Sequence, residues 1–140
     1  MTYPKILALD IGSVRVGVSV SDGLRLLAHP LTTLKWINEV HFLDDLKSLI
    51  KENNCDTLVI GIPYTLKGTD SDQTRRVRQL MDTIKANVEI KVETVDERLT
   101  TKMAENMLKD VNKKASRNRH IIDQLAAVNI LQLYLDKNRV

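Results

Sequence analysis

The sequence predicts an α/β layered domain with a mixed sheet, and three observations lead to this fold class. The chain opens with two β-branched runs, residues 5–11 and 14–20, separated by Gly-Ser, which is a hairpin signal. The run TLVIGIP at residues 57–63 is nearly all apolar and ends in proline, as expected of a central parallel strand. Segments with helical spacing of apolar residues flank this run. Strands that alternate with helices after an antiparallel opening give a mixed sheet covered by helices.

The predicted elements follow one another without a linker or an internal repeat. A third strand, RLLAHPLTTL at 25–34, completes the antiparallel opening. The later elements are a helix at 38–53, the strand at 57–63, a loop at 64–70, a helix from Ser71 or Asp72 to about Ala86, a strand at 89–96, a helix that starts near Thr100, and a last helix at about 121–136. The 140 residues fit one compact domain, residues 1–140.

The composition excludes several classes of protein. Hydrophobic residues make up 43% of the chain and charged residues 28%, which is ordinary for a soluble globular protein. No apolar run approaches the roughly 20 residues of a membrane helix, so no membrane partner is expected. The start MTYPKILALD lacks a secretory signal, and the single Cys55 cannot form an internal disulfide. We therefore expect a cytoplasmic protein in which Cys55 is a small buried hydrophobe.

Positive charge is concentrated in the basic segment, KDVNKKASRNRH at residues 109–120. The segment has a net charge of +4 and the whole chain +3, so the rest of the chain carries the difference, −1. Its basic residues are Lys109, Lys113, Lys114, Arg117 and Arg119. A basic segment on a nearly neutral body favours a polyanionic partner, and a solvated loop is the alternative interpretation.

A carboxylate stands at the end of the first predicted strand. In ILALDIG, Ile6, Ala8 and Asp10 alternate onto one face, so Asp10 ends a row of apolar residues. Gly12 permits a tight turn or the close approach of a ligand. Carboxylates at strand ends are where α/β folds hold metals or phosphates, and a turn-capping aspartate is the structural alternative.

Two more acidic sites occur at element ends. In TVDERLTT a strand ends in Asp96 and Glu97 before a predicted helix, whose N-terminus would also attract an acid for electrostatic reasons alone. Asp123 begins the apolar stripe of the last helix, where an unpaired charge is costly. An ion pair with Arg119, four residues earlier, is the structural alternative for Asp123.

These acids can meet at one edge of the sheet, where only cations would relieve their mutual repulsion. Ligands that are all oxygen select Mg²⁺ or Mn²⁺, and the three scattered histidines offer no zinc spacing. Carboxylates that clamp two such ions can activate a water and stabilise the leaving oxygen of a phosphodiester. The pattern therefore favours metal-dependent hydrolysis at a two-metal site.

Four segments in order resemble the successive motifs of the YqgF (RuvX) family: LALDIGSVRVGVSVSD, VIGIPYTLKGTDSDQTRRVRQL, VDERLTT and IIDQLAAVNILQLYLD. The resemblance covers nearly the whole chain. Members of this family are described as pre-16S rRNA nucleases or as Holliday junction resolvases. The resemblance implies a ribonuclease H-like fold, with a mixed five-stranded sheet flanked by helices. It also implies a catalytic, metal-binding acidic triad, which falls on Asp10, Glu97 and Asp123.

Other positions of the motifs carry weaker implications. Asp96 precedes the family's glutamate, so the resemblance gives it a structural role. Thr65 stands in GIPYTLKG where many members have asparagine, so a polar role of that position is not carried over. Arg15 occupies a usually basic position, and Arg76 can line the substrate path, although surface charge and helix solvation explain both equally well. The predicted nucleic-acid-binding residues are Arg15, Arg76, Lys113, Lys114, Arg117 and Arg119.

The leading hypothesis is a divalent-metal-dependent nuclease, a hydrolase acting on structured RNA or branched DNA. Processing of the 5′ end of pre-16S rRNA in ribosome biogenesis is favoured over Holliday junction resolution in DNA recombination and repair. A non-catalytic nucleic-acid-binding module is a further alternative. An ATPase that closes two domains over its nucleotide is disfavoured by the length of the chain. The protein is expected to be a monomer or a homodimer, and resolving a symmetric junction requires the dimer.

Overall fold

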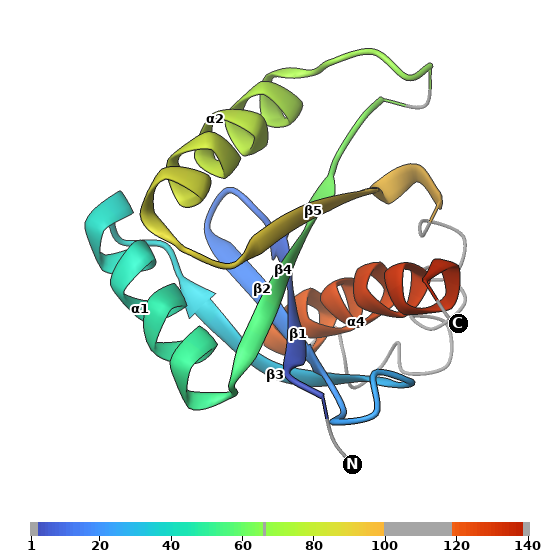
Figure 1. Ribbon diagram of the computed structural model, residues 1–140. Helices are drawn as coiled ribbons and strands as arrows, with labels where there is room; N and C mark the ends of the chain where they lie inside the picture. The colour runs from blue at the N-terminus through green and yellow to red at the C-terminus, as the bar shows by residue number, and fades with distance from the viewer. Residues whose placement is uncertain (1–2, 66, 100–118, 139–140) are drawn as a thin grey trace.

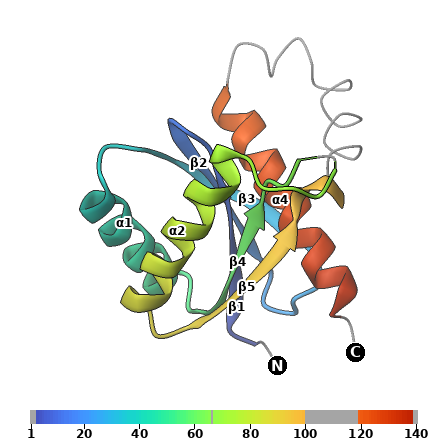
Figure 2. The same cartoon turned by 90° about the horizontal axis from the view of Figure 1, so that it is seen from above.

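The computed structural model describes residues 3–65, 67–99 and 119–138, which form one five-stranded sheet with helices on both faces (Figure 1 and Figure 2). The strands are β1 (Lys5–Ile11), β2 (Arg15–Ser21), β3 (Ala28–Lys35), β4 (Cys55–Ile62) and β5 (Lys91–Asp96). The helices are α1 (Glu39–Glu52), α2 (Asp72–Asn87) and α4 (Arg119–Lys137), with a 3-10 turn, η1 (Glu97–Leu99), directly after β5.

The sheet is mixed, as predicted, and its strand order is β3-β2-β1-β4-β5. Strand β2 is antiparallel to both of its neighbours, β1 and β3, whereas β1, β4 and β5 are parallel to one another. The carboxyl ends of the three parallel strands therefore share one edge of the sheet. This edge carries Asp10 near the end of β1, Ile62 at the end of β4 and Asp96 at the end of β5.

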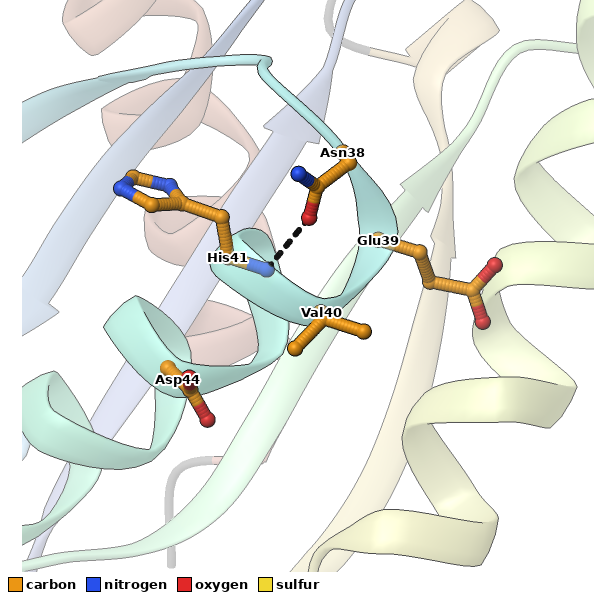
Figure 3. A pocket seen from close by; sticks show the side chains of 5 residues that line it. All are labelled: Asn38, Glu39, Val40, His41 and Asp44. Atoms are coloured by element: carbon orange, nitrogen blue, oxygen red, sulfur yellow. Dashed lines mark hydrogen bonds between the residues drawn. The ribbon is translucent and has the colours of Figure 1, made fainter.

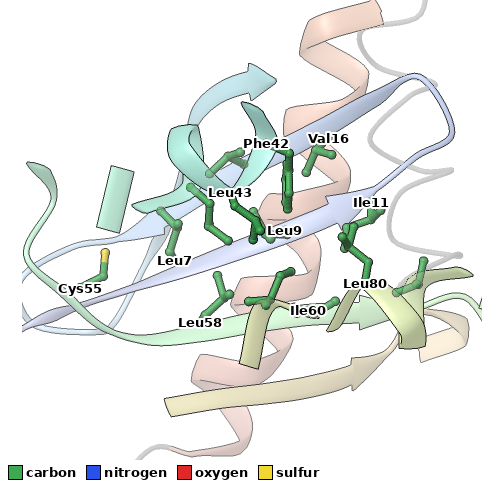
Figure 4. Packing of buried hydrophobic residues seen from close by; sticks show 14 of the residues in the cluster. Leu7, Leu9, Ile11, Val16, Phe42, Leu43, Cys55, Leu58, Ile60 and Leu80 are labelled. Atoms are coloured by element: carbon green, nitrogen blue, oxygen red, sulfur yellow. The ribbon is translucent and has the colours of Figure 1, made fainter. Parts of the chain in front are cut away.

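Helices α1 and α2 cover one face of the sheet and build the larger core (Figure 4). Leu7 and Leu9 of β1 and Leu58 and Ile60 of β4 point into this layer, and all four are fully buried. The helices contribute Phe42, Leu43, Leu46, Val77, Leu80 and Ile84. Cys55 is buried in the same layer, as predicted, and burial raises the pKa of its thiol to about 11.

Helix α4 covers the opposite face, so the described residues form a helix, sheet, helix sandwich (Figure 1). Its apolar residues pack on the other side chains of the same strands, because successive residues of a strand alternate between faces. This second core consists of Ile6, Ala8, Val59, Val95, Ile130, Leu131 and Leu135. Asp10 continues the row of Ile6 and Ala8 and therefore lies on the α4 side.

The element boundaries lie within two residues of the sequence prediction except at the start of β3. Strand β3 begins at Ala28 instead of residue 25, because the Asp22 carboxylate accepts hydrogen bonds from the amides of Leu26 (2.8 Å) and Leu27 (3.3 Å) and closes a turn there. Helix α4 begins at Arg119, two residues earlier than predicted. The helix predicted near Thr100 lies outside the described residues. No helix in the described part of the chain is both long and apolar enough to cross a membrane.

Candidate active site

Asp10 is the second-last residue of β1, and each of the two neighbouring strands has a glycine beside it. The register places Asp10 opposite Gly17 of β2. On the other side, Leu9 pairs with Ile60 of β4, so Gly61 follows next to Asp10. An isolated glycine inside a strand often marks the close approach of another group. Here each glycine is in contact with one of the other two predicted acids.

Gly61 leaves the space that Glu97 occupies. Glu97 follows β5 directly, and a Cβ atom on Gly61 would lie 2.7 Å from its Oε1 and 2.5 Å from Cδ1 of Ile130. Because β4 lies between β5 and β1, this gap lets the Glu97 side chain pass over β4. Glu97 and Asp10 reach each other and share a side-chain hydrogen bond.

Gly17 lets α4 lie directly on β2 and brings Asp123 to the same edge. A Cβ atom on Gly17 would collide with the backbone carbonyl of Asp123. The Asp123 carboxylate accepts a hydrogen bond from Nε of Arg15, at 2.8 Å from Nε to Oδ2. Arg15 lies two residues before Gly17, on the same face of β2. The cation beside Asp123 is thus Arg15, and the side chain of Arg119 lies outside the described residues.

The Asp10 and Glu97 pair resists ionisation. Burial raises the pKa of Glu97 to about 9, and the charge of Asp10 and the hydrogen bond to it act in the same direction. Burial also raises the pKa of Asp10, the hydrogen bond from Glu97 lowers it, and the charge of Asp123 raises it. Glu97 therefore remains protonated, and its carboxyl group donates a hydrogen bond to the Asp10 carboxylate. Two acids that share one proton are suited to bind a cation in its place.

The donor set fits a hard divalent cation. Mg²⁺ and Mn²⁺ prefer carboxylate oxygens, which is what Asp10, Glu97 and Asp123 offer. Within the described residues, no group of three or more acids, histidines or cysteines surrounds a common metal position. Asp10 and Glu97 are in contact, and Asp123 is held by Arg15. The structure thus brings two of the three predicted acids into direct contact and places the third beside them.

Arg76, predicted to bind nucleic acid, contacts the protein itself. Its Nη1 donates to the carbonyl of Gly12 at 2.9 Å, and its guanidinium lies over the ring of Trp36, 5.3 Å from the ring centroid. Trp36 packs in turn on Phe42 with a centroid distance of 5.3 Å. Arg76 therefore joins α2 to the turn that follows Asp10.

Asp96 is paired with Arg98, two residues along the chain. Its carboxylate accepts hydrogen bonds from Arg98, including one of 2.5 Å from Nη2, and these bonds hold the pKa of Asp96 below its usual range. The Arg98 guanidinium lies 5.6 Å from the ring centroid of Tyr64. In the same loop the hydroxyls of Thr65 and Thr69 are hydrogen bonded at 2.6 Å. Thr65 thus closes its own loop.

Lys113, Lys114 and Arg117 fall outside the described residues. The N-terminus of α1 lines an open depression of about 530 Å³, formed by Asn38, Glu39, Val40, His41 and Asp44 (Figure 3). None of the predicted site residues lines this depression. Asn38 caps the helix there by accepting a hydrogen bond from the His41 amide at 2.8 Å.

Comparison with known proteins places the chain in a family. The sequence model of the family described as RuvX, Holliday junction resolvase, matches residues 4–137. The chain belongs to the RuvX family. A protein of Roseiflexus sp. named "Putative pre-16S rRNA nuclease" is 39% identical over 135 residues, 96% of each chain. A protein of Fusobacterium nucleatum with the same name is 38% identical over 137 residues, covering 96% of this chain and 99% of its own.

Solved structures confirm the ribonuclease H-like fold. The chain is similar to T. thermophilus RuvC, solved in complex with a Holliday junction substrate, with a TM-score of 0.66, 10% identity and coverage of 99% and 98% of the two chains. The Fowlpox virus resolvase, solved with Holliday junction DNA, gives a TM-score of 0.59 at 12% identity and covers 95% and 97%. RuvX membership also confirms the predicted class of enzyme, a nuclease and hydrolase, and the ribonuclease H-like fold implies a divalent metal.

The sequence prediction missed the two glycines that make the RuvX site possible. Gly17 interrupts the β-branched run VRVGVSV, and Gly61 interrupts the apolar run LVIGIP. A lone glycine in such a run weakens the strand and is retained for packing or function. That signal is present in the sequence, but it does not say which segment approaches each glycine.

Gly17→Ala is expected to destabilise the protein more than Gly61→Ala. The new methyl group at Gly17 meets backbone of α4, which cannot move without displacing the helix, whereas at Gly61 it meets the ends of the Ile130 and Glu97 side chains. Overpacking of this kind costs roughly 1 to 3 kcal/mol. Urea unfolding of both variants measures the difference, and equal losses would show that α4 can shift away from β2.

Proposed function

We propose that this protein is a cytoplasmic, divalent-metal-dependent nuclease that processes the 5′ end of pre-16S rRNA. The observation that carries the proposal is the hydrogen-bonded pair of Asp10 and Glu97, with Asp123 beside it, at the carboxyl edge of the parallel strands. Acids whose pKa is raised in this way cluster at catalytic sites, which favours a nuclease over a non-catalytic binding module. The names of the curated relatives favour precursor rRNA as the substrate.

Each acid has a defined part in the proposed site. Asp10 and Glu97 would hold the cation, and Glu97 would then have to lose the proton of its hydrogen bond to Asp10. Asp123 would complete the ligand set, and Arg15, which pairs with Asp123 in the structure, would contact a substrate phosphate. When bound, two Mg²⁺ or Mn²⁺ ions would activate a water as nucleophile and stabilise the departing oxygen of the phosphodiester. The Arg15 guanidinium suits the phosphate because its planar fork matches phosphate oxygens.

Holliday junction resolution is the second candidate function. The description of the family favours it, and the two structural relatives were solved with junction DNA. Cutting a symmetric junction requires two active sites related by symmetry, and hence a homodimer. Processing of one RNA end needs a single site, so a monomer suffices for the first candidate.

The two candidate functions can be separated by testing both substrates with a single preparation of the protein. Precursor 16S rRNA and a four-way DNA junction are incubated with the protein at matched salt, with Mg²⁺, with Mn²⁺ or with EDTA. We expect metal-dependent cleavage of the RNA at a discrete position and slower cutting of the junction. Cleavage of the junction alone would support the second candidate. Binding of both substrates without cleavage of either, in any metal, would refute the nuclease.

The basic segment is expected to bind the phosphate backbone without reading its sequence. Changing Lys113 and Lys114 together to alanine removes two cations from a segment that has no aromatic residue to stack a base. Binding to all structured substrates should weaken alike, and the salt slope should fall by roughly 1 to 2, at about 0.7 to 0.9 per phosphate contact. Binding titrations over a range of salt concentrations measure this slope.

A matched double variant controls for net charge. Lys47 and Lys51 are exposed on α1, on the face of the sheet opposite α4. Changing both to alanine removes the same charge and should leave the slope close to that of the parent. If the two double variants weakened binding equally, the effect would belong to net charge and not to the basic segment.

A further inference from the structure

We propose that Gln73 and Arg76 of α2 are positioning residues that hold the catalytic end of β1. Nε2 of Gln73 donates to the carbonyl of Ile11 at 2.9 Å, and Nη1 of Arg76 donates to the carbonyl of Gly12 at 2.9 Å. These carbonyls belong to the two residues that follow Asp10. The inference rests on the proposed function, because it takes Asp10 to be a metal ligand.

The two carbonyls need donors because the sheet ends there. The parallel pairing of β1 with β4 stops at Leu9 and Ile60. Ile11 and Gly12 therefore have no paired residue in β4. Gln73 and Arg76 are three residues apart in α2, which places them on one face of the helix, one above the other. They supply side-chain donors where the ladder supplies none.

The hydrogen bonds from Gln73 and Arg76 form a clamp that holds the turn after β1 as well as the strand itself. The Gly12 amide donates to the Arg15 carbonyl at 2.9 Å, so residues 12–15 close a tight turn from β1 into β2. A Cβ atom on Gly12 would lie 2.7 Å from that carbonyl, so the turn requires a glycine. Arg15, at the far end of the turn, holds Asp123. Fixing Gly12 therefore fixes two of the three acids, Asp10 directly and Asp123 through Arg15.

Arg76 is itself held in place. Its guanidinium lies over the ring of Trp36, a cation–π contact, and Trp36 packs on Phe42 of α1. The backbone amide of Trp36 donates to the carbonyl of Val14 at 2.8 Å, so the same turn is held at a second point. Contacts in the α1 and α2 layer thereby fix the turn after Asp10, and with it the acids on the other face of the sheet.

The neighbouring Arg75 is a matched control. It is exposed on the same helix, and its ion pair is with Asp72 in the first turn of α2. Arg75→Ala therefore removes the same charge and side-chain length as Arg76→Ala without touching β1. Gln73→Ala and the Gln73 and Arg76 double variant complete the set, and Arg76→Lys keeps a donor without the planar fork.

Three measurements on the intact protein test the inference. Hydrogen exchange of the Gly12 amide reports the turn without metal or substrate, Mn²⁺ titration calorimetry reports the site, and kcat and KM report catalysis. In the double variant we expect faster exchange at Gly12, Mn²⁺ affinity weakened by about 10-fold or more, and lower kcat with little change in KM. Arg75→Ala should match the parent, and Arg76→Lys should recover part of the loss.

Other outcomes would overturn the inference. Unchanged exchange at Gly12 in the double variant would show that α2 does not hold the turn. A raised KM with unchanged kcat and Mn²⁺ affinity would make Arg76 a substrate-binding residue. If the parent bound no Mn²⁺ and cleaved neither substrate while exchange at Gly12 still rose in the variant, the proposed function would fail and the clamp on the turn would stand.

Discussion

Replacing Asp10 by asparagine is expected to lower metal-dependent cleavage by roughly 10³-fold or more while the protein stays folded. The amide is nearly the same size as the carboxylate and can still hydrogen bond to Glu97, but it carries no charge to hold a divalent cation. Without metal, the loss of one negative charge relieves repulsion from Glu97 and Asp123, so the melting temperature should be equal or higher.

The measurement is single-turnover cleavage of precursor rRNA, together with thermal unfolding in EDTA. Asp44→Asn is the matched control, because Asp44 is exposed on α1 and lies on the opposite side of the sheet from the acids. This control should cleave like the parent. Full activity of Asp10→Asn with an unchanged melting temperature would make Asp10 a turn-capping residue.

The metal-free protein is expected to lose stability as the pH rises from about 5 to about 9, owing to Glu97. In the unfolded chain a glutamate loses its proton near the ordinary pKa of 4.5, whereas in the folded protein Glu97 keeps it to about 9. Between these values the folded state binds one more proton than the unfolded state. The free energy of unfolding therefore falls with rising pH over this interval. The raised pKa of Asp10 acts in the same direction.

Glu97→Gln isolates this effect from all other titrating groups. Urea unfolding in EDTA is compared for parent and variant at mildly acidic and mildly alkaline pH, and the difference between the two proteins should change with pH. Adding Mg²⁺ should stabilise the parent more at the alkaline pH, because the cation takes the place of the shared proton. A pH-independent difference between parent and variant would contradict the shared proton.

Local patterns in the sequence predicted most of the framework. The alternation of Ile6, Ala8 and Asp10 placed the acid on the face that α4 covers, because side-chain direction along a strand depends only on position. Of the two residues predicted to begin α2, Ser71 and Asp72, it is Ser71 that caps the helix: its hydroxyl accepts a hydrogen bond from the Thr74 amide at 3.1 Å. Such features depend on neighbours in the chain, so they can be predicted without knowledge of the fold.

Contacts between distant segments decided the geometry of the site. Arg15 and Asp123 are 108 positions apart, and nothing near Asp123 in the sequence indicates that its partner would come from β2. Glu97 reaches Asp10 because parallel pairing puts β4 between their strands and Gly61 leaves room above it. Arg76, predicted from the sequence to bind nucleic acid, contacts Gly12 because α2 packs on that side of the sheet.

By itself, therefore, the sequence determined that Asp10 shares a face of β1 with Ile6 and Ala8, and where α2 begins to within one residue. Period-two alternation and helix capping act over a few covalent neighbours, so these features were readable residue by residue. Only the tertiary structure decided which acids share a proton, which cation holds Asp123 and what Arg76 does. Each of these features is a contact between side chains of different elements. Such contacts form only after the strands have paired in their final order and α4 has packed against Gly17.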